Sequence, residues 1–178
     1  MSFMEKLNLN LFKFILIFFL TLSNLAFSET KIISYNAIEV GVTDGDSLRF
    51  GKERIRLFGI DAPEIKQICN DKFKKPYACG EEAKKNLDEF ILSASAAKKK
   101  IYCYYSERDK YNRILGECFW GETREININW FMVLEGHAIA YLRYSDKYLD
   151  VQEIAKKGKL GIWAGTFDLP EEWRKKNK

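Results

Sequence analysis

The period of the hydrophobic positions changes along the chain, and each change predicts a different element. Between residues 32 and 58, apolar side chains alternate with polar ones in three runs, separated by turns at Asp44-Gly45 and Gly51-Lys52. Such alternation is the pattern of a half-buried β-strand, and Asp-Gly is a favoured hairpin connection. The sequence therefore predicts a three-stranded meander in this segment.

The rest of the chain mixes helical and strand patterns. Residues 80–97 carry apolar side chains at helical spacing and have no internal Pro or Gly, so they predict a helix. Strands are expected at 101–105 and 114–120, and further helices at 129–135 and 147–157, each helix followed by a glycine. Five short strands interleaved with about three helices predict an α+β domain with a five-stranded β-barrel of the OB-fold type.

The N-terminal segment is expected to lie outside this domain. Two lysines precede or interrupt an apolar run at residues 14–20, and Ala26-Phe27-Ser28 resembles a signal peptidase site. We therefore expect a signal peptide at 1–28, a mature domain at 29–178, and a secreted or periplasmic protein after cleavage near Ser28. The alternative is an uncleaved N-terminal membrane anchor, although the apolar run is far shorter than the ~20 residues that cross a bilayer.

The length of the chain indicates the number of domains, whereas its net charge says little about the kind of ligand. The chain has 178 residues, 47% of them hydrophobic, which is enough for one globular domain and too little for two. Its formal net charge of +4 favours a polyanionic ligand only weakly. Lys72, Lys74 and Lys75 are expected near the candidate site. The basic residues at the C-terminus, among them Arg174, are expected to form a solvated tail rather than a binding arm.

The four cysteines all follow the expected signal peptide. An even number of cysteines in an exported chain argues for two disulfides, and four cysteines allow three pairings. We favour Cys69 with Cys79, which closes a lysine-rich loop, and Cys103 with Cys118, which lie on strands expected to be neighbours. A zinc site is the competing interpretation, but there is no C-x-x-C spacing and the single histidine is His137, which we expect to be structural or on the surface.

Charged residues in three short segments supply what phosphodiester hydrolysis requires. Asp46 and Asp61 are carboxylates that can hold a hard divalent cation through oxygen. Glu64 can take a proton from water, and Arg56 and Arg113 can each fork onto a phosphate. A hairpin after Asp46 returns the chain beside the strand that carries Arg56 and leads to Asp61, so the two carboxylates could converge beside an arginine.

Each of these segments alone also has a purely structural explanation. Asp-Gly is an ordinary turn, and Asp61-Ala62-Pro63-Glu64 could simply end a strand with two acids facing water. Together, however, the three charged segments favour a catalytic site over separate structural roles. Calcium fits it better than a transition metal because the candidate ligands are oxygens without paired His or Cys, and magnesium remains open. Two carboxylates and one backbone carbonyl would leave positions for waters and a substrate phosphate.

The segments V-T-D-G-D-S, R-L-F-G-I-D-A-P-E, D-K-Y-N-R and G-K-L-G-I-W resemble the staphylococcal nuclease (thermonuclease) family, over residues 38–163. The resemblance implies a five-stranded OB-fold barrel with three helices. It also implies a calcium-dependent nuclease that hydrolyses DNA and RNA with little sequence preference and leaves a 3′-phosphate.

Carried over by motif position, the resemblance implies roles for individual residues. Asp46, Asp61 and the main-chain carbonyl of Ala62 would be the calcium ligands. The two arginines would contact the scissile phosphate, and Glu64 would be the general base or would orient the attacking water. Substrate-binding positions fall on Lys110, Tyr111 and Tyr141. The chain departs from the usual family residues at three positions: Ser47 and Ala62 stand in place of Thr, and Asn112 in place of Gly.

Two other functions fit parts of the sequence. One is a catalytically inactive OB-fold module that binds nucleic acid or protein, but such degenerate relatives lose the acids and arginines that are present here. The other is a structural calcium-binding domain, which would leave Arg56 and Arg113 unexplained. We therefore expect an enzyme with nucleic acid as its substrate. No stable protein partner is implied, and a monomer is expected.

Overall fold

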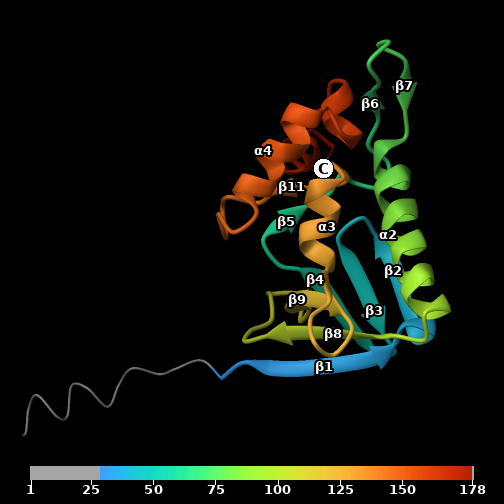
Figure 1. Cartoon of the computed structure of the whole chain (residues 1–178). Helices are drawn as coiled ribbons and strands as arrows, with labels where there is room; N and C mark the ends of the chain where they lie inside the picture. Colours follow the sequence, from blue (N-terminus) through green and yellow to red (C-terminus); the bar gives the residue numbers. More distant parts are fainter. Residues whose placement is uncertain (1–28, 178) are drawn as a thin grey trace, which may run out of the picture.

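The computed structural model describes residues 29–177 (Figure 1). The expected signal peptide, residues 1–28, lies outside the described residues. Within the described part no helix combines the length and the apolar character needed to cross a membrane. The elements in chain order are β1 (Lys31–Asn36), η1 (Ala37–Glu39), β2 (Val40–Asp44), β3 (Ser47–Phe50), β4 (Glu53–Leu57), β5 (Ile60–Asp61), β6 (Cys69–Asn70), β7 (Pro76–Tyr77), α2 (Cys79–Ala96), β8 (Lys100–Tyr105), β9 (Ile114–Trp120), β10 (Ile126–Asn127), α3 (Ile128–Leu134), β11 (Ile139–Ala140), α4 (Leu149–Gly158), η2 (Gly161–Ala164) and α5 (Pro170–Lys176).

A mixed sheet forms the framework of the domain. Its strand order is β1-β8-β9-β4-β3-β2, and β10 pairs with β9. Strands β2, β3 and β4 form the predicted antiparallel meander, and β4 joins β9 in parallel. The two later strands pair with each other as neighbours, β8 antiparallel to β9. The meander, the two later strands and three predicted helices are therefore confirmed, with ends shifted by about one or two residues, as helix and strand ends often are.

The prediction of a closed five-stranded barrel with about three helices is wrong in its counts. The main sheet has seven strands, and within residues 29–177 its end strands β1 and β2 are not paired with each other. The described part also contains four α-helices, α2 to α5. Strand β1 was not predicted because apolar and polar residues alternate poorly in its sequence; in the structure Ile32 is 59% exposed. Helix α5 was not predicted because it has only seven residues, most of them charged.

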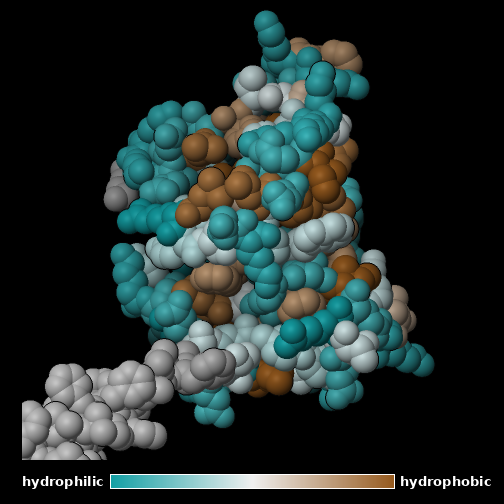
Figure 2. Space-filling view, turned by 60° about the vertical axis from the view of Figure 1, so that its left-hand side comes forward, coloured by the Kyte–Doolittle hydropathy of each residue, from teal (hydrophilic) through white to brown (hydrophobic). Residues whose placement is uncertain are grey.

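Helix α2 covers one face of the meander and runs alongside β2 (Figure 1). Its apolar stripe is buried in the main core, as its 3.6-residue period predicts: Ala83, Leu87, Phe90, Ile91 and Ala94. Opposite them lie apolar side chains of the sheet, such as Leu48 and Ile55, both essentially inaccessible. Hydrophilic side chains predominate over much of the face in Figure 2, and hydrophobic ones gather in a band across its upper half.

A buried asparagine joins helix α3 to the sheet. The Asn129 side chain accepts a hydrogen bond from the Cys118 N–H (3.0 Å) and donates to the carbonyls of Phe58 (2.9 Å) and Gly116 (3.2 Å). Asn127 caps the start of α3 by accepting from the Trp130 N–H. Because Phe58 immediately follows β4, Asn129 fixes the point where the chain leaves the sheet for β5 and the candidate site.

Both predicted disulfides are present, Cys69–Cys79 and Cys103–Cys118. The second bond links directly opposite residues of β8 and β9 and lies in the main core. The first closes the β6–β7 hairpin onto the start of α2. The zinc interpretation is wrong, because all four sulfur atoms are used in these bonds.

Loss of the Cys103–Cys118 bond is expected to destabilise the domain by about 3 kcal/mol, since it closes a loop of about 15 residues. Thermal unfolding followed by circular dichroism, with and without reductant, measures the effect. A Cys69→Ala/Cys79→Ala double variant separates the contribution of the hairpin disulfide from that of the core disulfide. Four titratable thiols in protein isolated under oxidising conditions, or an unfolding temperature unaffected by reduction, would contradict this expectation.

Candidate active site

A cleft of about 690 Å³ lies at the end of the sheet where β4 leads into β5. Its walls come from β4 and β5, from the loop before β9, from the segment after β11 and from helix α5. Strand β5 is held in place by β11, which pairs Ile139 with Asp61. Six of the residues predicted from the sequence line this cleft: Arg56, Glu64, Lys110, Tyr111, Arg113 and Tyr141.

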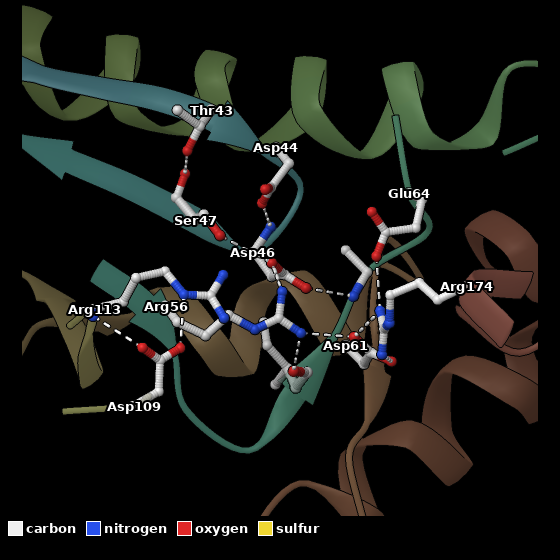
Figure 3. A network of polar contacts seen from close by, with 12 residues as sticks. Thr43, Asp44, Asp46, Ser47, Arg56, Asp61, Glu64, Asp109, Arg113 and Arg174 are labelled. Atoms are coloured by element: carbon white, nitrogen blue, oxygen red, sulfur yellow. Dashed lines mark hydrogen bonds and ion pairs between the residues drawn. The ribbon is translucent and has the colours of Figure 1, made fainter. Parts of the chain in front are cut away.

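Two buried aspartates meet beside Arg56; unlike Arg56, neither of them lines the cleft (Figure 3). Asp46 lies in the turn between β2 and β3 and is 2% exposed, and Asp61 ends β5 and is fully buried. The guanidinium of Arg56, on β4, is paired with the carboxylates of both, and its Nη2 lies 2.6 Å from Asp61 Oδ1. Buried charges need such partners, because an unpaired carboxylate in the interior costs several kcal/mol. The hairpin thus brings the two acids together beside one arginine.

Local hydrogen bonds fix the orientation of Asp46. Its Oδ2 accepts a bond from the Ala62 N–H at 2.8 Å, and its Oδ1 accepts one from the Ser47 hydroxyl at 3.2 Å. The Asp46 N–H in turn donates to Asp44 Oδ1 at 3.1 Å. Serine at position 47 therefore keeps a hydroxyl contact with the carboxylate. Alanine at position 62 takes part through its backbone.

Arg174 is the site residue that the sequence analysis missed. It was expected in a solvated tail, and that expectation is wrong, because helix α5 returns this side chain to the cleft (Figure 3). Its Nη1 and Nη2 form a fork on Asp61, at 3.0 and 2.9 Å, and Nη1 also lies 2.7 Å from Glu64 Oε1. A signal was available in Pro170, Glu171 and Glu172, since proline and acids in a first turn are typical of a helix start.

Burial by itself disfavours a charged guanidinium, but here the hydrogen bonds to Asp61 and Glu64 outweigh it and raise the pKa of Arg174. The side chain therefore stays positively charged throughout the working pH range of a protein. It offsets part of the negative charge of two acids, Asp61 and Glu64.

Arg113 is held at the mouth of the cleft by a local turn. Asp109 Oδ1 accepts bonds from the N–H groups of Tyr111 and Arg113, each at 2.9 Å, and Oδ2 accepts from Arg113 Nε at 2.8 Å. Burial raises the pKa of Asp109, but these hydrogen bonds with Arg113 and Tyr111 lower it overall. Asn112 has a left-handed backbone, with φ of 62°, which asparagine tolerates in place of glycine. In the described part of the chain, the terminal nitrogens of Arg113 make no hydrogen bond, so they can meet a phosphate.

Aromatic side chains line the same cleft. Tyr111 is 59% exposed, and Lys110 Nζ lies 5.0 Å from the centre of its ring. Tyr141 packs edge-on against Tyr144, with ring centroids 5.0 Å apart. Burial and the nearby charge of Asp61 raise the pKa of Tyr141, so its hydroxyl stays protonated at neutral pH. Exposed aromatic faces beside cationic groups are the usual surfaces on which nucleic-acid bases stack.

Other residues from the sequence analysis lie elsewhere. Lys72, Lys74 and Lys75 are in the β6–β7 hairpin region and do not line the cleft. His137 also lies outside it. Burial lowers the pKa of His137, despite the opposing charges of Glu82 and Glu89, so a structural role suits this residue.

The acids of the site suit a hard cation rather than a transition metal. Within residues 29–177 no group of three or more His, Cys, Asp or Glu side chains is arranged to hold a metal ion. Asp46 Oδ2 and Asp61 Oδ2 each accept one hydrogen bond, which leaves each oxygen one more lone pair. With the Ala62 carbonyl and water, this donor set fits the oxygen preference of calcium. It offers neither thiolate nor imidazole.

Comparison with known proteins places these residues in a wider context. The sequence profile described as "Staphylococcal nuclease homologue" matches residues 54–165. The succinoglycan biosynthesis protein ExoI of Rhizobium meliloti is 34% identical over 128 residues, which is 70% of this chain and 63% of that protein. An uncharacterized endonuclease of Haemophilus influenzae is 32% identical over 147 residues, 78% of this chain and 72% of the relative. A micrococcal nuclease of Shigella flexneri is 31% identical over 155 residues, covering 78% and 80%. The matched profile ends before Arg174.

Proposed function

The chain belongs to the staphylococcal nuclease family of phosphodiester hydrolases, and from this premise we propose that it cleaves DNA and RNA with little sequence preference, with calcium as its cofactor. The observation that carries the proposal is the pairing of Asp46, Asp61 and Glu64 with Arg56 and Arg174, two arginines that line one cleft. An inactive binding module would have no use for a buried pair of acids held beside Arg56 at the edge of that cleft.

The geometry suits in-line attack of water on a phosphodiester. Glu64 Oε1 is held by Arg174, and in the described residues Oε2 makes no hydrogen bond and can accept the proton of the attacking water. The new bond joins the water oxygen to phosphorus, and the bond from phosphorus to the 5′ oxygen breaks. The leaving oxygen takes up a proton, so the products are a 3′-phosphate and a 5′-hydroxyl.

Negative charge grows on the phosphoryl oxygens during this attack. The free nitrogens of Arg113 are placed to stabilise that charge, and Arg56 adds positive charge at the base of the cleft. A calcium ion, when bound, would add electrostatic stabilisation of the same charge. Its ligands would be Asp46, Asp61 and the Ala62 carbonyl, with water in the remaining positions. Lys110, Tyr111 and Tyr141 would contact the nucleotides on either side.

We also propose that the protein is exported and acts as a monomer. Two disulfides support export, because such bonds persist in oxidising compartments. N-terminal sequencing of protein recovered from cell fractions tests the proposal. A mature start near Glu29 in the periplasm or medium is the expected result. Retention of residues 1–28 in the membrane fraction would support the anchored alternative.

The test of the function is incubation of the purified protein with labelled DNA and RNA strands of mixed sequence. Both are expected to be cut at many positions, and the fragments are expected to carry 3′-phosphates, which a phosphatase specific for that end detects. Intact strands after prolonged incubation with calcium would contradict the proposed activity. Fragments with 3′-hydroxyl ends would contradict the proposed bond of cleavage.

A further inference from the structure

The C-terminal helix contributes a third arginine to the acids of the site. Arg174 contacts both oxygens of Asp61 and one oxygen of Glu64, whereas Arg56 contacts Asp46 and Asp61 (Figure 3). In residues 29–177 the only cation within ion-pairing distance of Glu64 is Arg174. These contacts span 110 and 113 residues of sequence.

The placement of α5 depends on more than this ion pair. Gln67 is fully buried, and its side chain accepts a bond from the Glu64 N–H (3.2 Å) and donates to the Asp168 carbonyl (2.7 Å). Asn70 and Thr166 exchange backbone hydrogen bonds of 2.9 and 3.0 Å. The loop that carries Glu64 and the segment that leads into α5 are therefore tied together at several points. Arg174 is therefore held in a fixed position by tertiary contacts and does not lie in a solvated tail.

We propose that Arg174 is a positioning residue, which holds the Glu64 carboxylate against Asp61 so that its free oxygen faces the attacking water. The inference rests on the proposed function. Without the guanidinium, two carboxylates would lie close together with only Arg56 to offset them, and Glu64, whose side chain is 36% exposed, would turn toward solvent.

The hydrogen bonds of Arg174 argue against two other roles. Three of the five N–H groups of the Arg174 guanidinium donate to carboxylates, so few donors are left to bind a phosphate. An inhibitory latch would need to leave for catalysis, yet the segment before α5 is fixed by Gln67 and Thr166. A positioning role predicts an effect on kcat rather than on KM.

The first test compares Arg174→Met with Lys175→Met, a matched control that removes an exposed positive charge from the adjacent position of α5. Arg174→Met is expected to lower kcat about tenfold or more and to change KM less than about twofold, because misplacing a catalytic group slows the step without weakening binding. Arg174→Lys, which keeps the charge without the fork, should recover part of the rate and serves if the methionine variant fails to fold. Lys175→Met should match the wild type.

A second test asks whether Arg174 acts through Glu64. In a Glu64→Gln background, Arg174→Met should reduce kcat little further, because residues that act as a unit are not additive. Calorimetric titration with calcium alone gives a readout independent of activity. Loss of a positive charge beside Asp61 should leave calcium affinity equal or higher.

Several outcomes would overturn the inference. Three results would each contradict the positioning of Glu64. The first is an unchanged kcat in both Arg174 variants. The second is that Arg174→Met lowers kcat by the same factor in the Glu64→Gln background as in the wild type, and the third is a weaker affinity for calcium. A raised KM with normal kcat would assign Arg174 to the substrate, and a raised kcat would make it a latch. If the wild type cleaves nothing, the proposed function falls as well. If the wild type is active and Arg174→Met equals it, only the inference falls.

Discussion

Replacement of Glu64 by glutamine is expected to lower kcat by a factor on the order of 10² or more, with KM changed much less. The amide has nearly the same shape and can still accept the hydrogen bond from Arg174, but it cannot take a proton from water. Initial rates on a defined oligonucleotide over a range of concentrations separate kcat from KM. The effect should be seen in a variant whose circular dichroism spectrum matches that of the wild type.

Glu107→Gln is the matched control for this substitution. Glu107 is an acid in the wall of the same cleft, but it belongs to the loop before β9 and is paired with neither Arg56 nor Arg174. Its replacement should leave kcat close to that of the wild type. If the folded Glu64→Gln protein keeps its full kcat, Glu64 has no part in the chemistry.

Replacement of Asp46 by alanine is expected to reduce the calcium-stimulated rate to the level measured in chelator. The change removes one of two converging carboxylates and leaves Arg56 paired with Asp61 alone. It also leaves the Ala62 N–H without its acceptor, at a cost of about 1–3 kcal/mol, which a folded domain of this size can bear. Rates with and without calcium, together with thermal unfolding, check both parts of the prediction.

Asp88→Ala, which removes an exposed acid from α2, is the control and should respond to calcium as the wild type does. A folded Asp46→Ala protein that is fully active in buffer freed of calcium would rule out the site at Asp46 and Asp61.

Local patterns in the sequence were sufficient for much of the fold. The period of Ala83, Leu87 and Phe90 predicts α2, and all three side chains are buried against the sheet. The turn at Gly51-Lys52 predicts the β3–β4 hairpin, which places Ser47 opposite Arg56 and so brings Asp46 beside Arg56. These features depend on residues close together in the chain, where the hydrophobic period and the turn residues decide the structure.

Long-range contacts explain what local patterns could not predict. Strand β1 exists because it pairs with β8, some 70 residues later, and its own sequence shows little alternation. Helix α5 is too short to show a clear period, and Arg174 reaches Asp61 across 113 residues. Whether the basic end of a chain is solvated or returns to a site is decided by tertiary contacts, here those of Gln67 and Thr166.

We expect phosphodiester hydrolysis at Asp46, Asp61 and Glu64 to depend on calcium. The most direct measurement is the initial rate at which the wild-type protein cleaves one labelled oligonucleotide as free calcium is raised from chelated to millimolar levels. The rate should rise and saturate with calcium and return to baseline when chelator is added. Equal rates in calcium and in chelator, or no cleavage at any calcium level, would contradict it.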